Sequence, residues 1–65
     1  MRLRVNGETR EIEAERLAAA LDELGYRAAR VATALNGVFV PHGQREAQRL
    51  ADGDALEILA PMQGG

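Results

Sequence analysis

The sequence predicts a small α+β domain in which a mixed sheet of four or five strands packs against one main helix. Asn-Gly pairs stand at 6–7 and 36–37, each between short runs of alternating apolar and polar residues. One segment of helical periodicity lies between these pairs, and a last alternating run lies near the carboxyl end. A helix laid across one face of a sheet is a compact way to bury both apolar surfaces.

The first hairpin is expected from residue 1 to residue 13. In residues 1–5, apolar side chains alternate with arginines, which is the period of a strand with one solvated face. Asn6-Gly7 favours a type I′ turn, because both central positions of that turn need a positive φ. The return strand, Glu8 to Glu13, is polar with Ile12 as its clearest inward residue, so we expect it at an edge of the sheet.

The main helix is expected over Arg16–Leu24. Leu17, Leu21 and Leu24 fall at i, i+4 and i+7, which places them on one face of a helix. Gly25 follows, and a left-handed glycine is a common helix stop. No Ser, Thr, Asp or Asn stands where the helix begins, so its first residue is uncertain by a few positions.

The second hairpin is expected to have strands over 31–35 and 38–40, joined by Asn36-Gly37. This two-residue turn puts Leu35 and Val38 opposite each other on one face, which Val40 shares, and points Phe39 to the other face with Ala34. The alternative is that Phe39, the only Phe, is a core residue, because a register slip of one residue moves every side chain to the opposite face.

The remainder of the chain is expected to close the sheet. Residues 43–50 have a short helical pattern anchored by Ala47 and Leu50, Asp52-Gly53-Asp54 forms a turn, and the last strand covers 55–59. The first and last strands then lie parallel in the middle of the sheet, because the intervening chain supplies the long crossover. The predicted core consists of Leu3, Val5, Ile12, Leu17, Leu21, Leu24, Val31, Leu35, Val40, Leu50, Leu56 and Ile58.

Composition excludes several classes of function. The 65 residues carry a net charge of −2, whereas a nucleic-acid-binding surface is basic. There is no Cys, and the single His42 offers no partners for a metal site, so we expect no metal. No apolar run approaches the ~20 residues of a membrane span, and no signal-peptide pattern opens the chain. We therefore expect a cytoplasmic protein.

The last residues, Met62-Gln63-Gly64-Gly65, follow the final strand without a cap. Glycine gains no packing and loses much conformational freedom when it is ordered, so these residues are either a frayed end or a slender terminus that another protein holds. We expect a folded domain over 1–60 and a flexible diglycine tail over 61–65.

The element order resembles the ubiquitin-like β-grasp fold, and with its terminal diglycine the chain resembles the ThiS family of sulfur carrier proteins. The resemblance covers nearly the whole chain. It departs from the family pattern at His42, where many members have a basic residue, and near Arg45, where they have an aromatic one. The residues that carry it are Val5-Asn6-Gly7, Ala34-Leu35-Asn36-Gly37, Val40-Pro41, Asp52-Gly53-Asp54 and Gly64-Gly65.

The resemblance implies a role as a protein co-substrate rather than an enzyme. A ThiF-like adenylyltransferase would use ATP to adenylate the carboxylate of Gly65, and a sulfur donor such as a cysteine desulfurase relay would convert it to a thiocarboxylate. A ThiG-like thiazole synthase would take that sulfur for the thiazole of thiamine. The chain itself would bind no cofactor and would be a monomer when free. The expected partner-binding residues are Phe39, Leu59, Met62, Gln63, Gly64 and Gly65.

Other functions stay open at this point. The small subunit of molybdopterin synthase has the same fold and terminal chemistry, although its tail usually follows a proline-rich turn. A ubiquitin-like modifier would instead join Gly65 to a target lysine through an amide bond. A plain interaction module would carry an inert tail. The short length and the single Pro61 before the tail favour the ThiS family over molybdopterin synthase.

Overall fold

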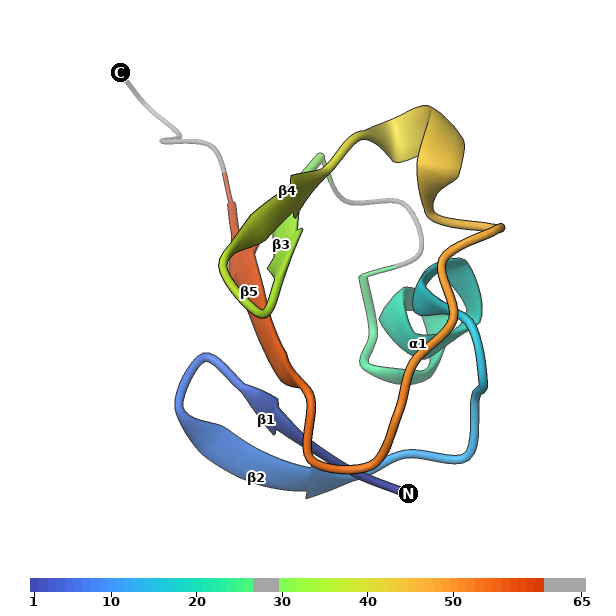
Figure 1. Ribbon diagram of the computed structural model, residues 1–65. Coiled ribbons are helices and arrows are strands. Elements are labelled where there is room, and N and C mark those ends of the chain that lie inside the picture. The colour runs from blue at the N-terminus through green and yellow to red at the C-terminus, as the bar shows by residue number, and fades with distance from the viewer. Residues whose placement is uncertain (27–29, 61–65) are drawn as a thin grey trace.

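The computed structural model of the protein describes residues 1–26 and 30–60. Five strands, one helix and one 3₁₀ turn follow each other in the predicted order (Figure 1). Within these ranges the longest helix has seven residues, and none is long and apolar enough to cross a membrane. The elements are β1 (Arg2–Val5), β2 (Glu8–Glu11), α1 (Leu17–Glu23), β3 (Ala32–Leu35), β4 (Val38–Val40), η1 (His42–Gln44) and β5 (Ala55–Leu59).

The five strands form one sheet in the order β2-β1-β5-β3-β4. The central pair, β1 and β5, is parallel, and every other neighbouring pair is antiparallel, as the sequence predicts. Figure 1 shows α1 and the chain from η1 to β5 on the same side of the sheet. The other side, which we call the open face, is covered by no helix of the described residues.

Both Asn-Gly pairs adopt the predicted turn. The φ angles are 52° at Asn6 and 84° at Gly7, and they are 51° and 83° at the equivalent positions of the second hairpin. The second turn sets Leu35 opposite Val38 and Ala34 opposite Phe39. Because side chains alternate along a strand, Val40 is buried and Phe39 faces outward. The alternative with Phe39 in the core is therefore wrong.

The helix is one residue shorter at each end than predicted. Arg16 precedes it with an extended backbone and no side-chain cap, and Gly25 stops it at φ +95°. The Gly25 N–H donates to Asp22 O (3.1 Å) and the Tyr26 N–H donates to Leu21 O (2.8 Å), the pair of bonds that defines a Schellman C-cap. These bonds satisfy carbonyls that the end of a helix otherwise leaves open.

A carboxylate from the end of α1 holds the chain that leads into it. Glu23 accepts hydrogen bonds from the backbone N–H of Glu13 (2.9 and 3.1 Å) and of Ala14 (3.0 Å). The strand before this segment ends at Glu11, two residues earlier than predicted, but Ile12 stays buried and paired, since its N–H donates to Met1 O (2.8 Å). The hydrogen bonds to the Glu23 carboxylate therefore fix the connection between β2 and α1.

The core lies between the sheet and α1. Ten of the twelve predicted core residues are fully buried, whereas Leu24 and Val31 are partly buried and pack against the others. Ala47 is exposed, contrary to prediction, because the segment after η1 runs as turns rather than as a helix, and only Leu50 anchors it. The buried cluster contains Leu3, Val5, Ile12, Leu17, Ala20, Leu21, Leu35, Val40, Leu50, Leu56 and Ile58.

Two buried polar residues, Thr33 and Arg45, were not foreseen. Arg45 Nε donates to Thr33 Oγ1 (3.1 Å) and Nη2 donates to Val31 O (2.6 Å). Arg45 Nη1 lies 3.3 Å from Nδ1 of His42, which can accept when it carries no proton. The Thr33 hydroxyl donates in turn to Val40 O (2.9 Å). The guanidinium thus joins the loop after β4 to β3 and to the residue before it.

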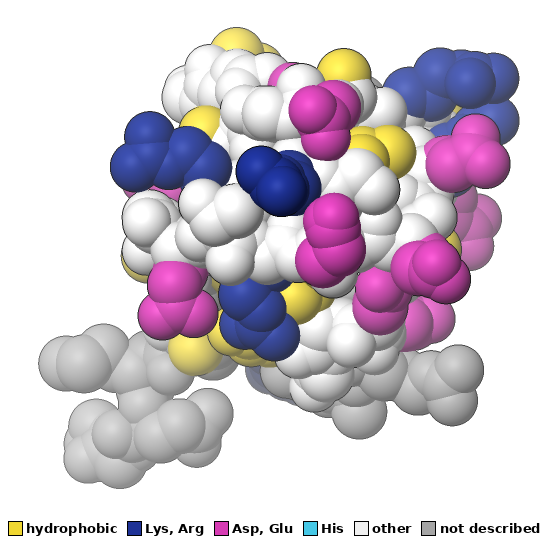
Figure 2. Space-filling model, turned by 90° about the horizontal axis from the view of Figure 1, so that it is seen from below, with side chains coloured by type: hydrophobic (Ala, Val, Ile, Leu, Met, Phe, Trp, Pro, Cys, Tyr) yellow, Lys and Arg dark blue, Asp and Glu magenta, His cyan; other side chains and the backbone are white. Residues whose placement is uncertain are grey.

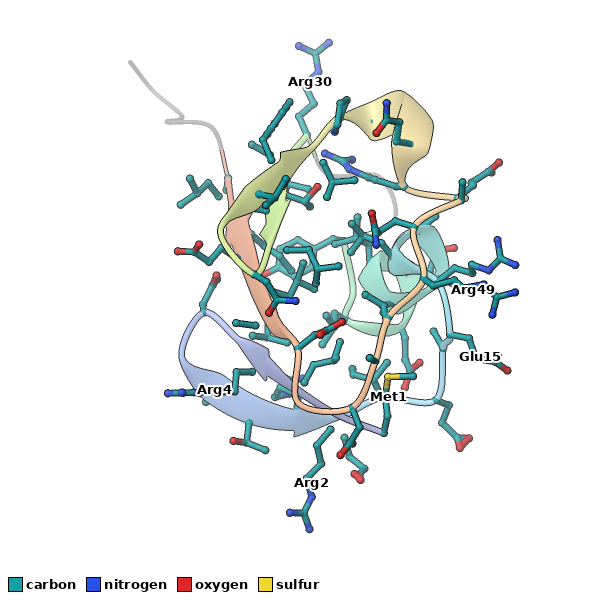
Figure 3. The ribbon with its side chains drawn as sticks, viewed as in Figure 1. Met1, Arg2, Arg4, Glu15, Arg30 and Arg49 are labelled. Atoms are coloured by element: carbon teal, nitrogen blue, oxygen red, sulfur yellow. The ribbon has the colours of Figure 1, made fainter. Side chains whose placement is uncertain are left out.

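We expect Arg45→Ala to lower the free energy of unfolding by about 2–4 kcal/mol, because it removes the buried stem and leaves the Val31 carbonyl without its donor. Arg45→Met should lose less, since it restores the stem. Arg49→Ala is the matched control, because Arg49 is exposed (Figure 3), and it should change stability by less than about 0.5 kcal/mol. Urea unfolding of the three variants measures this, and equal effects of the Arg45 and Arg49 alanine variants would contradict the prediction.

Candidate functional site

The open face carries an apolar patch over β3, β4 and β5. Phe39 and Leu59 are 64% and 69% exposed, which is unusual for large apolar side chains. Ala34 pairs with Phe39 and Ala32 pairs with Leu59, so the two alanines of β3 lie between the two large side chains. We call these four residues, Ala32, Ala34, Phe39 and Leu59, the open-face patch. The sequence predicted its two large members.

The surface of the open-face patch is hollowed. A hollow of about 100 Å³ lies between Phe39, Leu59 and the two alanines, and Thr33 and Glu57 also line it. A second hollow of about 370 Å³ starts at Leu59 and reaches Arg30 and Ala60. The hollows share Leu59 and Ala32, so they adjoin each other at the end of β5.

Charged side chains stand at both ends of this surface. Figure 3 shows Arg30 beyond one end of β3 and Arg4 on β1, with the patch strands between them. By contrast, the face seen in Figure 2 has side chains of both charge signs spread over it, with only small apolar areas between them. The face seen in Figure 2 is therefore more highly charged than the open-face patch.

The patch adjoins the point where the chain leaves the sheet. β5 ends at Leu59, which belongs to the patch, and Ala60 follows it. The other predicted site residues, Met62, Gln63, Gly64 and Gly65, lie outside the described residues. The structure thus brings Phe39 and Leu59 together on one face and sets them beside the residue that precedes the predicted tail.

Both turn asparagines have a second role that turn chemistry did not reveal. Asn6 Nδ2 donates to Ile58 O (3.1 Å), and the Ile58 N–H donates to Asn6 Oδ1 (2.8 Å). Asn36 Oδ1 accepts from the Ala55 N–H (2.9 Å), and its Nδ2 donates to Asp54 Oδ1 (3.0 Å). The two side chains therefore hold β5 near its end and at its start. The repeated Asn-Gly pair was the only feature of the sequence that could have drawn attention to these asparagines.

A third hollow, of about 310 Å³, lies on the opposite side, between α1 and the η1 loop. Its floor includes Arg45, whose bonds belong to the buried network described above. It does not adjoin the open-face patch, and we assign no role to it. It is lined by Ala18, Leu21, Asp22, Tyr26, His42, Gly43, Arg45 and Glu46.

A mixed sheet with parallel central strands, one covering helix and a last strand that leads toward a diglycine defines a ubiquitin-like β-grasp protein of the carrier type. The ThiS family model matches residues 3–65. The chain belongs to the ThiS family, the sulfur carrier proteins of thiamine biosynthesis.

Two relatives agree with this assignment. The sulfur carrier protein ThiS of Thermus thermophilus is 39% identical over 66 residues, an alignment that covers 94% of this chain and 95% of the relative. The crystal structure of the thiamine biosynthesis protein ThiS from Geobacter metallireducens is 35% identical, covers both chains completely and superimposes with a TM-score of 0.81. The predicted fold class is confirmed.

Proposed function

We propose that this chain carries sulfur for thiamine biosynthesis as a thiocarboxylate on Gly65. One observation carries the proposal: the family match runs through residue 65, so the diglycine lies within the family pattern. The relative from Thermus thermophilus is named a sulfur carrier protein, which supports the same role. In this proposal the chain is a co-substrate and not an enzyme.

The chemistry needs only the terminal carboxylate. An α-carboxyl group has a pKa of about 3.5, so it is ionised at neutral pH and can attack a phosphorus atom. Attack on the α-phosphate of ATP releases pyrophosphate and leaves an acyl-adenylate on Gly65. A persulfide on the sulfur donor then attacks the acyl carbon and AMP leaves, which gives an acyl disulfide. A thiol attacks the donor's sulfur of that disulfide, so the S–S bond breaks, the thiocarboxylate leaves and the donor and the thiol end as a disulfide. A ThiF-like adenylyltransferase would bind the ATP, so this chain needs no cofactor of its own.

The open-face patch is proposed to dock the adenylyltransferase. Phe39 and Leu59 offer exposed apolar surface, and large exposed apolar side chains typically become the anchors of an interface. Because Leu59 is followed by Ala60, a partner seated on the patch has the departing chain at its edge. Gly64 and Gly65 would then enter the ATP site, where the lack of a Cβ keeps the chain narrow.

One experiment tests the reaction. The protein is incubated with a ThiF-like adenylyltransferase, ATP, a thiol reductant, and a cysteine desulfurase with free cysteine as the sulfur source, and its intact mass is measured. We expect the mass gain of one sulfur atom replacing one oxygen atom. A high-mass conjugate would instead indicate a protein modifier, and an unchanged mass would indicate an inert tail.

A second experiment tests the destination of the sulfur. The thiocarboxylated protein is offered separately to a ThiG-like thiazole synthase and to the large subunit of molybdopterin synthase. Each enzyme is supplied with the substrate that receives the sulfur, and we expect the thiazole synthase to return the protein to its original mass. Transfer only to the molybdopterin enzyme would overturn the assignment to thiamine while leaving the terminal chemistry intact.

A further inference from the structure

Near the end of β5, the backbone N–H and C=O of Ile58 have no backbone partner in the neighbouring strand β1. Alternate residues of a strand direct their backbone groups to opposite sides. Ala55 O accepts from the Asn36 N–H (2.7 Å) on the β3 side, whereas Leu56 O accepts from the Asn6 N–H (2.9 Å) on the β1 side. Ile58 is two residues beyond Leu56, so its backbone also faces the β1 side. β1, however, ends at Val5, and the chain turns away at Asn6 and Gly7.

The side chain of Asn6 takes the place of the missing strand residue. A carboxamide has one acceptor oxygen and an NH₂ donor, the same groups that a peptide unit presents to a ladder. Asn6 uses both on one residue, because Oδ1 accepts from the Ile58 N–H (2.8 Å) and Nδ2 donates to Ile58 O (3.1 Å). The β1–β5 ladder is thereby extended by one residue.

We propose that Asn6 is a positioning residue for the terminus that carries sulfur. By holding Ile58, it fixes Leu59 in the open-face patch and sets the point from which the chain runs to Gly65. Gly65 is seven residues beyond Ile58 (65 − 58), and such a segment spans at most about 25 Å. Asn6 therefore limits how far from the patch the carboxylate can be delivered. This inference rests on the proposed function of Gly65.

Without these two bonds, Ile58 and Leu59 would join the backbone that the adenylyltransferase must order on binding. Ordering backbone costs conformational entropy, and this cost falls on binding and not on the chemical step. We therefore expect Asn6→Gly, which keeps the turn but removes the carboxamide, to raise the KM for the carrier by about tenfold. The kcat should stay unchanged.

The second hairpin supplies a matched control. Asn36 has nearly the same φ and the same following glycine, but it holds Ala55, at the other end of β5 from Leu59. Asn36→Gly removes a carboxamide of the same type from an equivalent turn. We expect it to leave the KM for the carrier unchanged, even where its effect on thermal unfolding equals that of Asn6→Gly.

Two measurements are made on the full chain. Hydrogen exchange reports the Ile58 amide, which should exchange faster in Asn6→Gly and not in Asn36→Gly. ATP–pyrophosphate exchange with the ThiF-like enzyme reports KM and kcat. Should Asn6→Gly fail to fold, Asn6→Asp serves instead, because it keeps the acceptor and sets an oxygen against the Ile58 carbonyl. Asn36→Asp is its control.

Equal changes of KM in the Asn6 and Asn36 variants would overturn the inference, and so would unchanged protection of the Ile58 amide. Failure of the proposed function is distinguishable from both outcomes. If the proposed function fails, the unmodified protein itself supports no ATP–pyrophosphate exchange. The hydrogen-exchange comparison still decides whether Asn6 anchors β5.

Discussion

Gly65→Leu is expected to abolish both the acyl-adenylate and the thiocarboxylate and to leave thermal unfolding unchanged. The reason is steric, because a terminal glycine has no Cβ and can enter a narrow ATP site that a branched side chain would block. The fold should not respond, since β5 ends at Leu59, well before the substitution. Intact mass after incubation with the adenylyltransferase, ATP and sulfur donor measures the loss.

Gly43→Leu is the matched control for this substitution. Gly43 has no positive φ, and a Cβ added there meets no atom within 4 Å, so the same glycine-to-leucine change should be tolerated. We expect this variant to gain sulfur as the unmodified protein does. A Gly65→Leu protein that still shows the mass of the thiocarboxylate would disprove a requirement for glycine at the terminus.

The double variant Phe39→Ala, Leu59→Ala is expected to fold normally and to bind the adenylyltransferase poorly. Both side chains are mostly exposed, so their loss removes little packing from the folded chain. If both act as anchors of the interface, their removal should weaken binding by about 2–4 kcal/mol, or roughly 30- to 1000-fold. Isothermal titration calorimetry with the adenylyltransferase measures the change.

Val38→Ala tests whether any exposed apolar side chain would have the same effect. Val38 is 68% exposed, but it pairs with Leu35 and so belongs to the other face of the sheet. We expect this variant to bind like the unmodified protein. Unchanged affinity of the double variant, or an equal loss in Val38→Ala, would refute the open-face patch as the docking surface.

Local sequence signals predicted much of this fold. The Asn-Gly pairs set the two turns, and the turns set the register that sends Phe39 outward and Val40 inward. The strands Val38–Val40 and Ala55–Leu59 have the predicted bounds, because alternation and a turn or proline delimit each of them. These features depend on neighbouring residues, and a single sequence contains that information.

Contacts between distant residues could not be predicted in the same way. Arg45 is buried because Thr33 and Val31 satisfy its guanidinium, and nothing near Arg45 in the sequence indicates those partners. Asn6 bonds to Ile58, 52 residues away, although its turn propensity alone explains its presence. At the candidate site, the exposed positions of Phe39 and Leu59 agree with prediction, and the roles of Gly64 and Gly65 stay predictions.

The parallel pairing of β1 with β5 has a consequence for synthesis of the chain. Arg4 lies opposite Ala55, so the two central strands come from opposite ends of the sequence. A ribosome makes the first strand early, but its central partner emerges last, and native pairing has to wait for it. A chain that stops before residue 55 lacks the middle of its sheet. The adenylyltransferase would thus find a folded sheet to bind only on chains that have been translated through β5.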